Sequence, residues 1–252
     1  MAILSTDAIV LQVRDYLESS RIVRLVTREA GVLSAIAKGA RRTRARTGSA
    51  LDLFAEGVAH LYVKPSRDLQ TMAGFDSGRG RPELGEQLER FVAASAVGEF
   101  ALRVLHEEPN VPAYETLVHT LDALATHPLA EVDSAALAGL WRMVETLGFA
   151  PALDVCANCH TPIGPDDEPV RFVIRTGGAL CPRCARLGGA GRALPAAARS
   201  SIGGWLAGEP VDPPPTESIR AHQRLLREFL TEHVLGDRPL RAWAVWEGGW
   251  PR

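Results

Sequence analysis

Apolar residues alternate with polar ones along the first 75 residues of the chain and recur at helical spacing along most of the rest. Alternation at every second position is typical of strands with one buried face. It predicts five strands, at residues 8–13, 21–27, 32–38, 51–64 and 69–75. Five strands with no clear helix between them suit a small closed β-barrel, and a five-stranded OB-fold is the economical choice. An SH3-like barrel stays open, because periodicity alone does not separate the two.

Residues 77–81 are rich in glycine and arginine and are expected to end the barrel, so we expect a domain at 1–80 and a second at 81–252. Apolar residues at helical spacing then predict a mainly α-helical domain. The expected helices cover residues 82–105, 113–127, 133–148, 194–206 and 216–235. The fold class is therefore α+β and multidomain. Three of the five tryptophans lie in residues 240–250, and we expect this tail to pack back on the helices.

All four cysteines lie in one stretch, as two CxxC pairs: Cys156 with Cys159, and Cys181 with Cys184. Two such pairs aim four thiolates at one centre, the arrangement that holds a structural Zn²⁺ ion. The turn-rich, partly alternating segment between them predicts a zinc ribbon at 153–187, inserted among the helices. The alternatives are two disulfides, four reduced thiols, a redox CxxC, or a ligand role for His160.

The first twenty residues lack the apolar core of a signal peptide, and no run of about 18 apolar residues suggests a membrane span. We therefore expect a soluble, cytoplasmic protein, whose reducing environment disfavours disulfides. The net charge of −2 is unevenly distributed, since residues 1–80 hold 12 Lys and Arg against 8 Asp and Glu, while the remainder holds 16 against 22. A basic front half indicates a polyanionic partner.

Five cations and no acid occupy the segment between the third and fourth expected strands: Lys38, Arg41, Arg42, Arg44 and Arg46. Glycines at both ends favour a basic loop at the barrel rim that contacts several phosphates of DNA or RNA. A merely solvated loop is the alternative.

Other barrel residues are candidates for the same surface. Arg14, Arg21 and Arg24 could extend it, but each taken alone suits the ordinary exterior of a strand. Phe54 and Tyr62 could stack on bases, although their spacing favours the core.

Short motifs throughout the chain resemble the RecO family of recombination mediators. The segment Glu29-Ala30-Gly31, followed by residues 37–42 (AKGARR), is similar to the family's turn and basic KGAR loop. Residues 147–156 (LGFAPALDVC) and 178–184 (GALCPRC) are similar to the family's sequences around its cysteines. Each motif is short, so their order along the chain carries the specificity. The tail with Trp243, Trp246 and Trp250 has no counterpart in these motifs.

The resemblance implies an N-terminal OB-fold, a helical domain with a zinc motif, and a role in DNA repair by homologous recombination. It implies binding of single- and double-stranded DNA, strand annealing, and action with RecR and single-strand-binding protein to help load RecA, in a bacterial, nucleoid-associated setting. It assigns DNA contact to Lys38, Arg41 and Arg42, and one Zn²⁺ ion to the four cysteines. Arg44 and Arg46 rest on charge alone.

A catalytic function finds little support in the sequence. A four-thiolate zinc site has no open position for substrate, and the chain has no phosphate-binding glycine loop, HExxH pair or nucleophile elbow. We therefore expect a non-enzymatic DNA-binding protein. The alternative is a zinc-ribbon protein that binds RNA or assists transcription.

Overall fold

The computed structural model describes residues 2–40, 51–164, 170–187, 191–236 and 238–248. Contacts divide the chain into two compact units, one formed by Met1–Leu129 with Leu240–Trp246 and the other chiefly by Ala130–Pro239. Two compact units need not be the two parts of the chain that fold independently. The expected domain boundary near residue 80 therefore remains a prediction.

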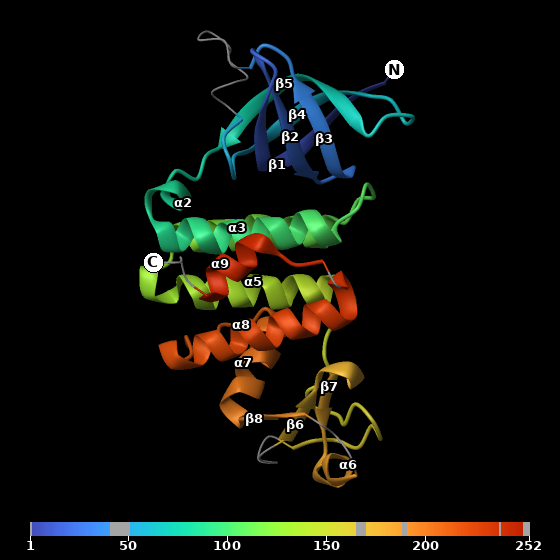
Figure 1. Ribbon diagram of the computed structural model, residues 1–252, viewed down its shortest axis with the longest axis vertical. Helices are drawn as coiled ribbons and strands as arrows, with labels where there is room; N and C mark the ends of the chain where they lie inside the picture. The colour runs from blue at the N-terminus through green and yellow to red at the C-terminus, as the bar shows by residue number, and fades with distance from the viewer. Residues whose placement is uncertain (1, 41–50, 165–169, 188–190, 237, 249–252) are drawn as a thin grey trace. The chain divides into compact units, whose positions relative to one another are not determined.

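The first unit contains a closed five-stranded barrel with the strand order β1-β2-β3-β5-β4 (Figure 1). Its strands are β1 (Ala2–Tyr16), β2 (Ser20–Thr27), β3 (Gly31–Ala37), β4 (Glu56–Val63) and β5 (Leu69–Arg79). Strand β1 closes the barrel by pairing with β4 along its first half and with β2 along its second, with a register shift between Val10 and Gln12. The parallel pairing of β3 with β5 completes an OB-fold, as predicted.

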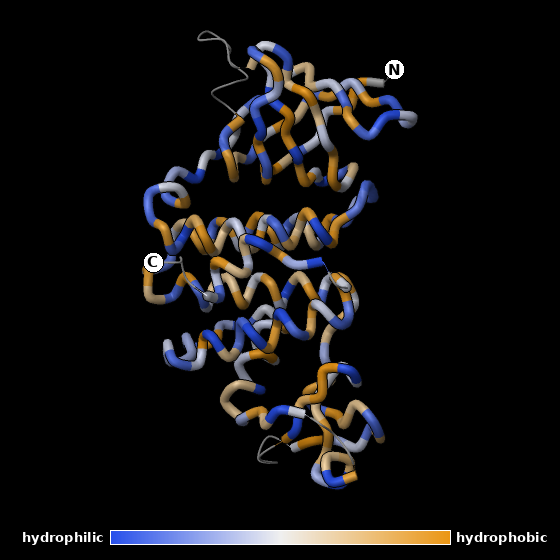
Figure 2. Tube along the Cα trace, viewed as in Figure 1, coloured by the Kyte–Doolittle hydropathy of each residue, from blue (hydrophilic) through white to orange (hydrophobic). Residues whose placement is uncertain are grey.

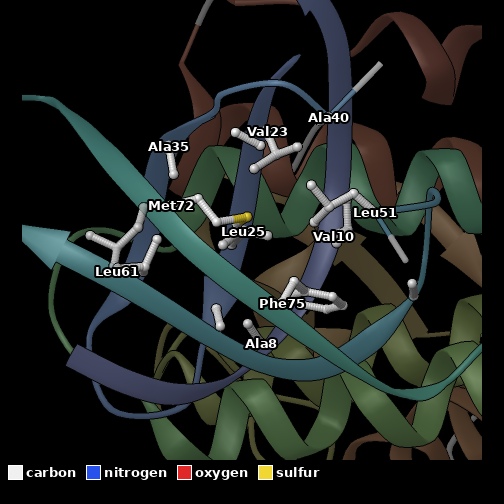
Figure 3. Packing of buried hydrophobic residues seen from close by; sticks show 14 residues of the cluster. Ala8, Val10, Val23, Leu25, Ala35, Ala40, Leu51, Leu61, Met72 and Phe75 are labelled. Carbon is white, nitrogen blue, oxygen red and sulfur yellow. The ribbon is translucent and has the colours of Figure 1, made fainter. Parts of the chain in front are cut away.

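Alternating residues of the five strands fill the barrel interior (Figure 3). Val10, Val23, Leu25 and Leu61 are all essentially inaccessible to solvent. The residues between them point to the outer face of the barrel. Hydrophobic and hydrophilic positions are mixed along the barrel strands (Figure 2). Leu51, predicted to begin the fourth strand, instead lies in the segment before β4 and packs into the same core.

The helices of the first unit are α2 (Glu83–Glu86), α3 (Leu88–Val104) and α4 (Val111–Thr126), with part of α9 (Arg241–Gly248). The single helix expected at 82–105 is two helices, because Gln87 adopts an extended backbone between α2 and α3. The tail packs as expected for its described part, since Trp243 and Trp246 are buried. The Glu99 carboxylate on α3 accepts the N–H groups of Arg241 and Ala242 at 2.9 and 2.7 Å, at the start of α9. Trp250 lies outside the described residues.

The segment predicted to be the domain boundary contains a buried ionic network. The Arg81 side chain is only 1% exposed and contacts Glu56 on β4 at 2.6 Å and Asp122 on α4 at 2.7 Å. It also donates to the Phe54 carbonyl at 3.0 Å. The network joins the end of the barrel to the helix that follows.

The second unit combines helices with a small sheet. Its helices are α5 (Val132–Thr146), α6 (Pro182–Arg186), α7 (Ala196–Ala207) and α8 (Thr216–Leu230), and α8 continues as a π-helical turn, η3 (Thr231–Leu235). Strands β6 (Val170–Val173), β7 (Gly178–Leu180) and β8 (Arg192–Leu194) form an antiparallel sheet in the order β7-β6-β8. Trp141 and Phe229 stack between α5 and α8, with ring centroids 5.6 Å apart. Within the described residues no helix is long and apolar enough to cross a membrane.

Candidate nucleic-acid interface and metal centre

The first cysteine pair lies in a tight turn. The Cys156 N–H donates to the Thr161 carbonyl at 2.8 Å, and the His160 N–H donates to the Cys156 carbonyl at 2.9 Å. His160 adopts a left-handed backbone with φ of 56°, which closes the turn. A bridge between Val155 and Pro162 holds its two ends together. These contacts aim the Cys156 and Cys159 sulfurs in one direction.

The second pair is carried by the end of β7 and the start of α6. Cys181 caps α6 and Cys184 lies within its only full turn. The Ala157 N–H donates to the Ala179 carbonyl at 2.8 Å, which joins the two pairs. Gly178 permits this approach, because a Cβ there would overlap Ala152. The small sheet therefore brings together cysteines that are 22 residues apart in the chain.

The four cysteine sulfurs all lie within 4.8 Å of one another, and none forms a disulfide. The Sγ atoms of Cys159 and Cys181 are 3.8 Å apart. Tetrahedral Zn²⁺ with Zn–S bonds of about 2.3 Å requires an S···S distance of about 3.8 Å. Cys156, Cys181 and Cys184 are buried, and Cys159 is exposed. Distance and donor chemistry thus both fit a tetrahedral metal ion, and the cluster includes no histidine among the described residues.

The thiols of the cluster have divergent pKa values. Burial alone raises the pKa of Cys156, but the backbone N–H groups of Cys181, Cys159 and Asn158 outweigh it and lower the pKa to about 6. The Asn158 amide lowers the pKa of Cys184, yet the neighbouring Cys159 thiol and burial raise it to about 11. Four thiolates do not coexist here without a cation, because their charges repel. A metal ion removes that repulsion and displaces the protons.

Of the five predicted DNA contacts, the structure describes one. Lys38 is exposed in the turn that follows β3, beside Gly39, which has a left-handed φ of 71°. Arg41, Arg42, Arg44 and Arg46 lie outside the described residues.

The other barrel residues considered for nucleic-acid contact differ in their burial and in their partners. Phe54 is buried in the core, as its spacing favoured, whereas Tyr62 is 37% exposed on the outer face of β4. Arg21 pairs with Asp15 at 3.4 Å. Arg24 lines a cleft together with Arg103 of α3, a residue that the sequence did not single out. Only the packing of α3 against the barrel reveals that pair.

Comparison with known families matches residues 1–77 to the N-terminal domain of Recombination protein O and residues 85–243 to its C-terminal domain. A DNA repair protein RecO of Anaeromyxobacter sp. (strain K) is 37% identical over 240 residues, which covers 91% of each chain. Another, from Nocardioides sp., is 32% identical over 254 residues and covers 96% of this chain and 98% of the relative. A third, from Symbiobacterium thermophilum, is 33% identical over 184 residues. With its OB-fold barrel, helices and four-cysteine cluster, the chain belongs to the RecO family of DNA repair proteins.

Proposed function

We propose that the protein is a recombination mediator that binds single- and double-stranded DNA and anneals complementary strands. We further propose that it acts with RecR to help load RecA onto DNA coated by single-strand-binding protein. The observation that carries the proposal is the closed OB-fold barrel whose third strand ends at the exposed Lys38, where the basic segment begins. OB-folds bind nucleic acid along such surfaces, and the family membership supports DNA as the ligand.

The mechanism is electrostatic and needs no covalent chemistry. Lys38, Arg41 and Arg42, with Arg44 and Arg46, neutralise backbone phosphates and release condensed counterions, which drives binding without regard to base sequence. Two strands held on one basic surface repel each other less, so complementary bases pair more readily. The protein therefore acts as a mediator in the bacterial cytoplasm, at the nucleoid, and not as an enzyme.

The four cysteines would hold one structural Zn²⁺ ion. The bound ion would supply a fixed positive centre that joins the two CxxC turns. Cys156, Cys159, Cys181 and Cys184 fill a tetrahedral sphere, so no position stays open for water or substrate. The Asn158 amide, 3.5 Å from the Cys184 sulfur, orients that ligand. The site stabilises the segment between α5 and α7 and leaves the DNA chemistry to the barrel.

Strand annealing tests the proposed function. Complementary labelled oligonucleotides are mixed with the full-length protein without ATP, with and without single-strand-binding protein on the DNA. Annealing should accelerate in both cases, and RNA oligonucleotides of the same sequence should anneal more slowly. Acceleration of RNA pairing alone would favour the RNA-binding alternative, and acceleration of neither would contradict the proposal.

A further inference from the structure

A cleft of about 610 Å³ opens on the outer face of the barrel, where the last turn of α3 packs against β2 and β3. One wall comes from the strands and the other from the end of α3 and the segment after it. Its polar lining consists of Arg24, Ser34, Arg103, His106, Glu107 and Glu108. The two carboxylates belong to the segment that follows α3.

The strand register directs two arginines to this outer face. Arg24 lies opposite Ser34 of β3 and Gln12 of β1, while its neighbours Val23 and Leu25 are buried in the core. Arg14 of β1 lies opposite Ile22, two residues from Arg24 and on the same face of the sheet. Side chains in this diagonal relation are about 7 to 8 Å apart at their backbones, within reach of two guanidinium groups.

Arg14 and Arg103 lie close to Arg24 on this surface, and Glu107 and Glu108 line the same cleft. Within the described part of the chain, none of the three forms an ion pair, and Arg24 only donates to the Leu102 carbonyl at a long 3.4 Å. Burial, followed by the positive charges of Arg103 and Arg14, lowers the pKa of Arg24. Arg21 of the same strand differs, because it pairs with Asp15. Clustered cations that form no ion pair within the described residues attract an anion.

Backbone contacts hold the cleft in shape. The Val32 N–H at the start of β3 donates to the His106 carbonyl at 2.7 Å. Gly31, with φ of 65°, allows the chain after α3 to approach, since a Cβ there would overlap the carbonyls of His106 and Glu108. Arg24 and Arg103 therefore face each other across a preformed cleft.

We propose that Arg24 and Arg103 bind backbone phosphates of a DNA strand in this cleft, and that Arg14 continues the contact towards the β1–β2 turn. Guanidinium groups suit this role because their fork of N–H donors matches phosphate oxygens.

Tyr16 provides a surface for base stacking at the end of this path. It is 42% exposed and lies two residues beyond Arg14. Glu107 and Glu108 repel phosphate and keep the strand on the arginine side. This inference rests on the proposed DNA binding and adds a contact surface to the basic segment that begins at Lys38.

The test measures binding of a fluorescent oligothymidylate by anisotropy over a range of salt concentrations. Each phosphate contact on single-stranded DNA contributes about 0.7 to the slope of log K against log salt, which corresponds to about fivefold in affinity at 0.1 M. Arg24→Gln with Arg103→Gln should therefore weaken binding about 25-fold and flatten the slope by about 1.4. Arg14→Gln should lower affinity about fivefold. Tyr16→Leu should weaken binding equally at all salt concentrations.

Arg21→Gln is the matched control, because it removes a cation from the same strand that is already paired with Asp15. It should change affinity less than about twofold. Thermal unfolding of every variant checks the fold, and the exposed Arg14 and the single substitutions at Arg24 and Arg103 carry the test if the double variant unfolds.

The outcomes separate this inference from the proposed function. If the wild-type protein binds DNA and replacement of Lys38, Arg41 and Arg42 weakens it, but the double variant behaves like Arg21→Gln, the cleft does not bind DNA and the proposed function stands. If the wild-type protein does not bind DNA, both are wrong. A third arm titrates inorganic phosphate alone. Phosphate binding that the double variant loses, with unchanged oligonucleotide affinity, would assign the cleft to a free anion and overturn the proposal.

Discussion

The four-cysteine cluster and the outer surface of the barrel differ in how their polar side chains are arranged. The cysteines converge on one point, three of them are buried, and all four sulfurs are needed to surround an ion. Arg14, Arg24 and Arg103 come from different elements, and within the described residues none of them forms an ion pair. A closed site stabilises its own unit, whereas an open charged surface binds something outside. On the proposed function, the strongest motif in the sequence therefore belongs to the scaffold, and the weaker pattern of basic residues belongs to the DNA-binding surface.

Removal of the metal ligands should produce the largest effect and should affect only one side of this comparison. Structural zinc contributes about 10 kcal/mol or more of apparent folding energy in small domains. Cys156→Ser with Cys159→Ser should abolish zinc binding, measured by metal analysis, and should unfold the segment around β6 and β7, measured by hydrogen exchange. The barrel should retain its protection and most of its DNA affinity.

His160→Asn is the matched control for that experiment, because asparagine tolerates the left-handed backbone at this turn. It should retain one zinc per chain. Loss of zinc in this control would make His160 a ligand after all, and unfolding of the barrel in the double cysteine variant would contradict the separation of the two regions.

Gly31→Ala should have the largest effect on the barrel side. Alanine at φ of 65° costs about 1 to 2 kcal/mol, and its Cβ would also collide with the chain after α3. We expect the free energy of unfolding of the barrel to fall by about 3 kcal/mol, measured by denaturant titration. Gly74→Ala is the control, because its Cβ would make only ordinary contact with His60 at 3.7 Å. Equal effects of the two substitutions would refute the close approach at Gly31.

Replacement of Lys38, Arg41 and Arg42 by alanine should affect DNA binding and leave stability unchanged. Loss of three phosphate contacts predicts a decrease in affinity of about 100-fold at 0.1 M salt and a slope smaller by about 2. The decrease should be the same for oligonucleotides of different sequence, since phosphate contacts carry no base information. An unchanged salt slope would show that these three residues do not contact DNA phosphates. Zinc content, measured in parallel, should not change.

Local pattern predicted the elements of this fold better than their ends. Alternation located all five strands, but the fourth begins at Glu56 and not at residue 51, because Phe54 adopts φ of 66° and its N–H donates to Val10. Periodicity did not reveal the break at Gln87, although Gly85 lies two residues before it in α2.

The features that the sequence did not predict depend on contacts between residues far apart in the chain. The CxxC spacing indicated the metal centre because its ligands are paired within short turns. The pairing of Arg24 with Arg103 depends on packing between residues 79 positions apart, and no local pattern encodes that. Arg81 belongs to the segment predicted to be the domain boundary, and Glu56 and Asp122 enclose its side chain.

The smallest expected effect is a pH dependence confined to the unit that contains the cysteines. His222 of α8 is 3% exposed, stacks edge-on against Trp205 at 5.1 Å and has a pKa lowered by burial. Because the unfolded chain protonates near pH 6.5 and the native imidazole only at lower pH, stability is unaffected above that value and decreases as the pH falls below it. The free energy of unfolding falls by at most about 1.4 kcal/mol per pH unit.

His222→Gln should reduce this fall in the free energy of unfolding between pH 7 and 5, measured by denaturant titration at fixed zinc. An identical pH profile in the variant would mean that acid destabilises this unit through the cysteines and not through the buried histidine.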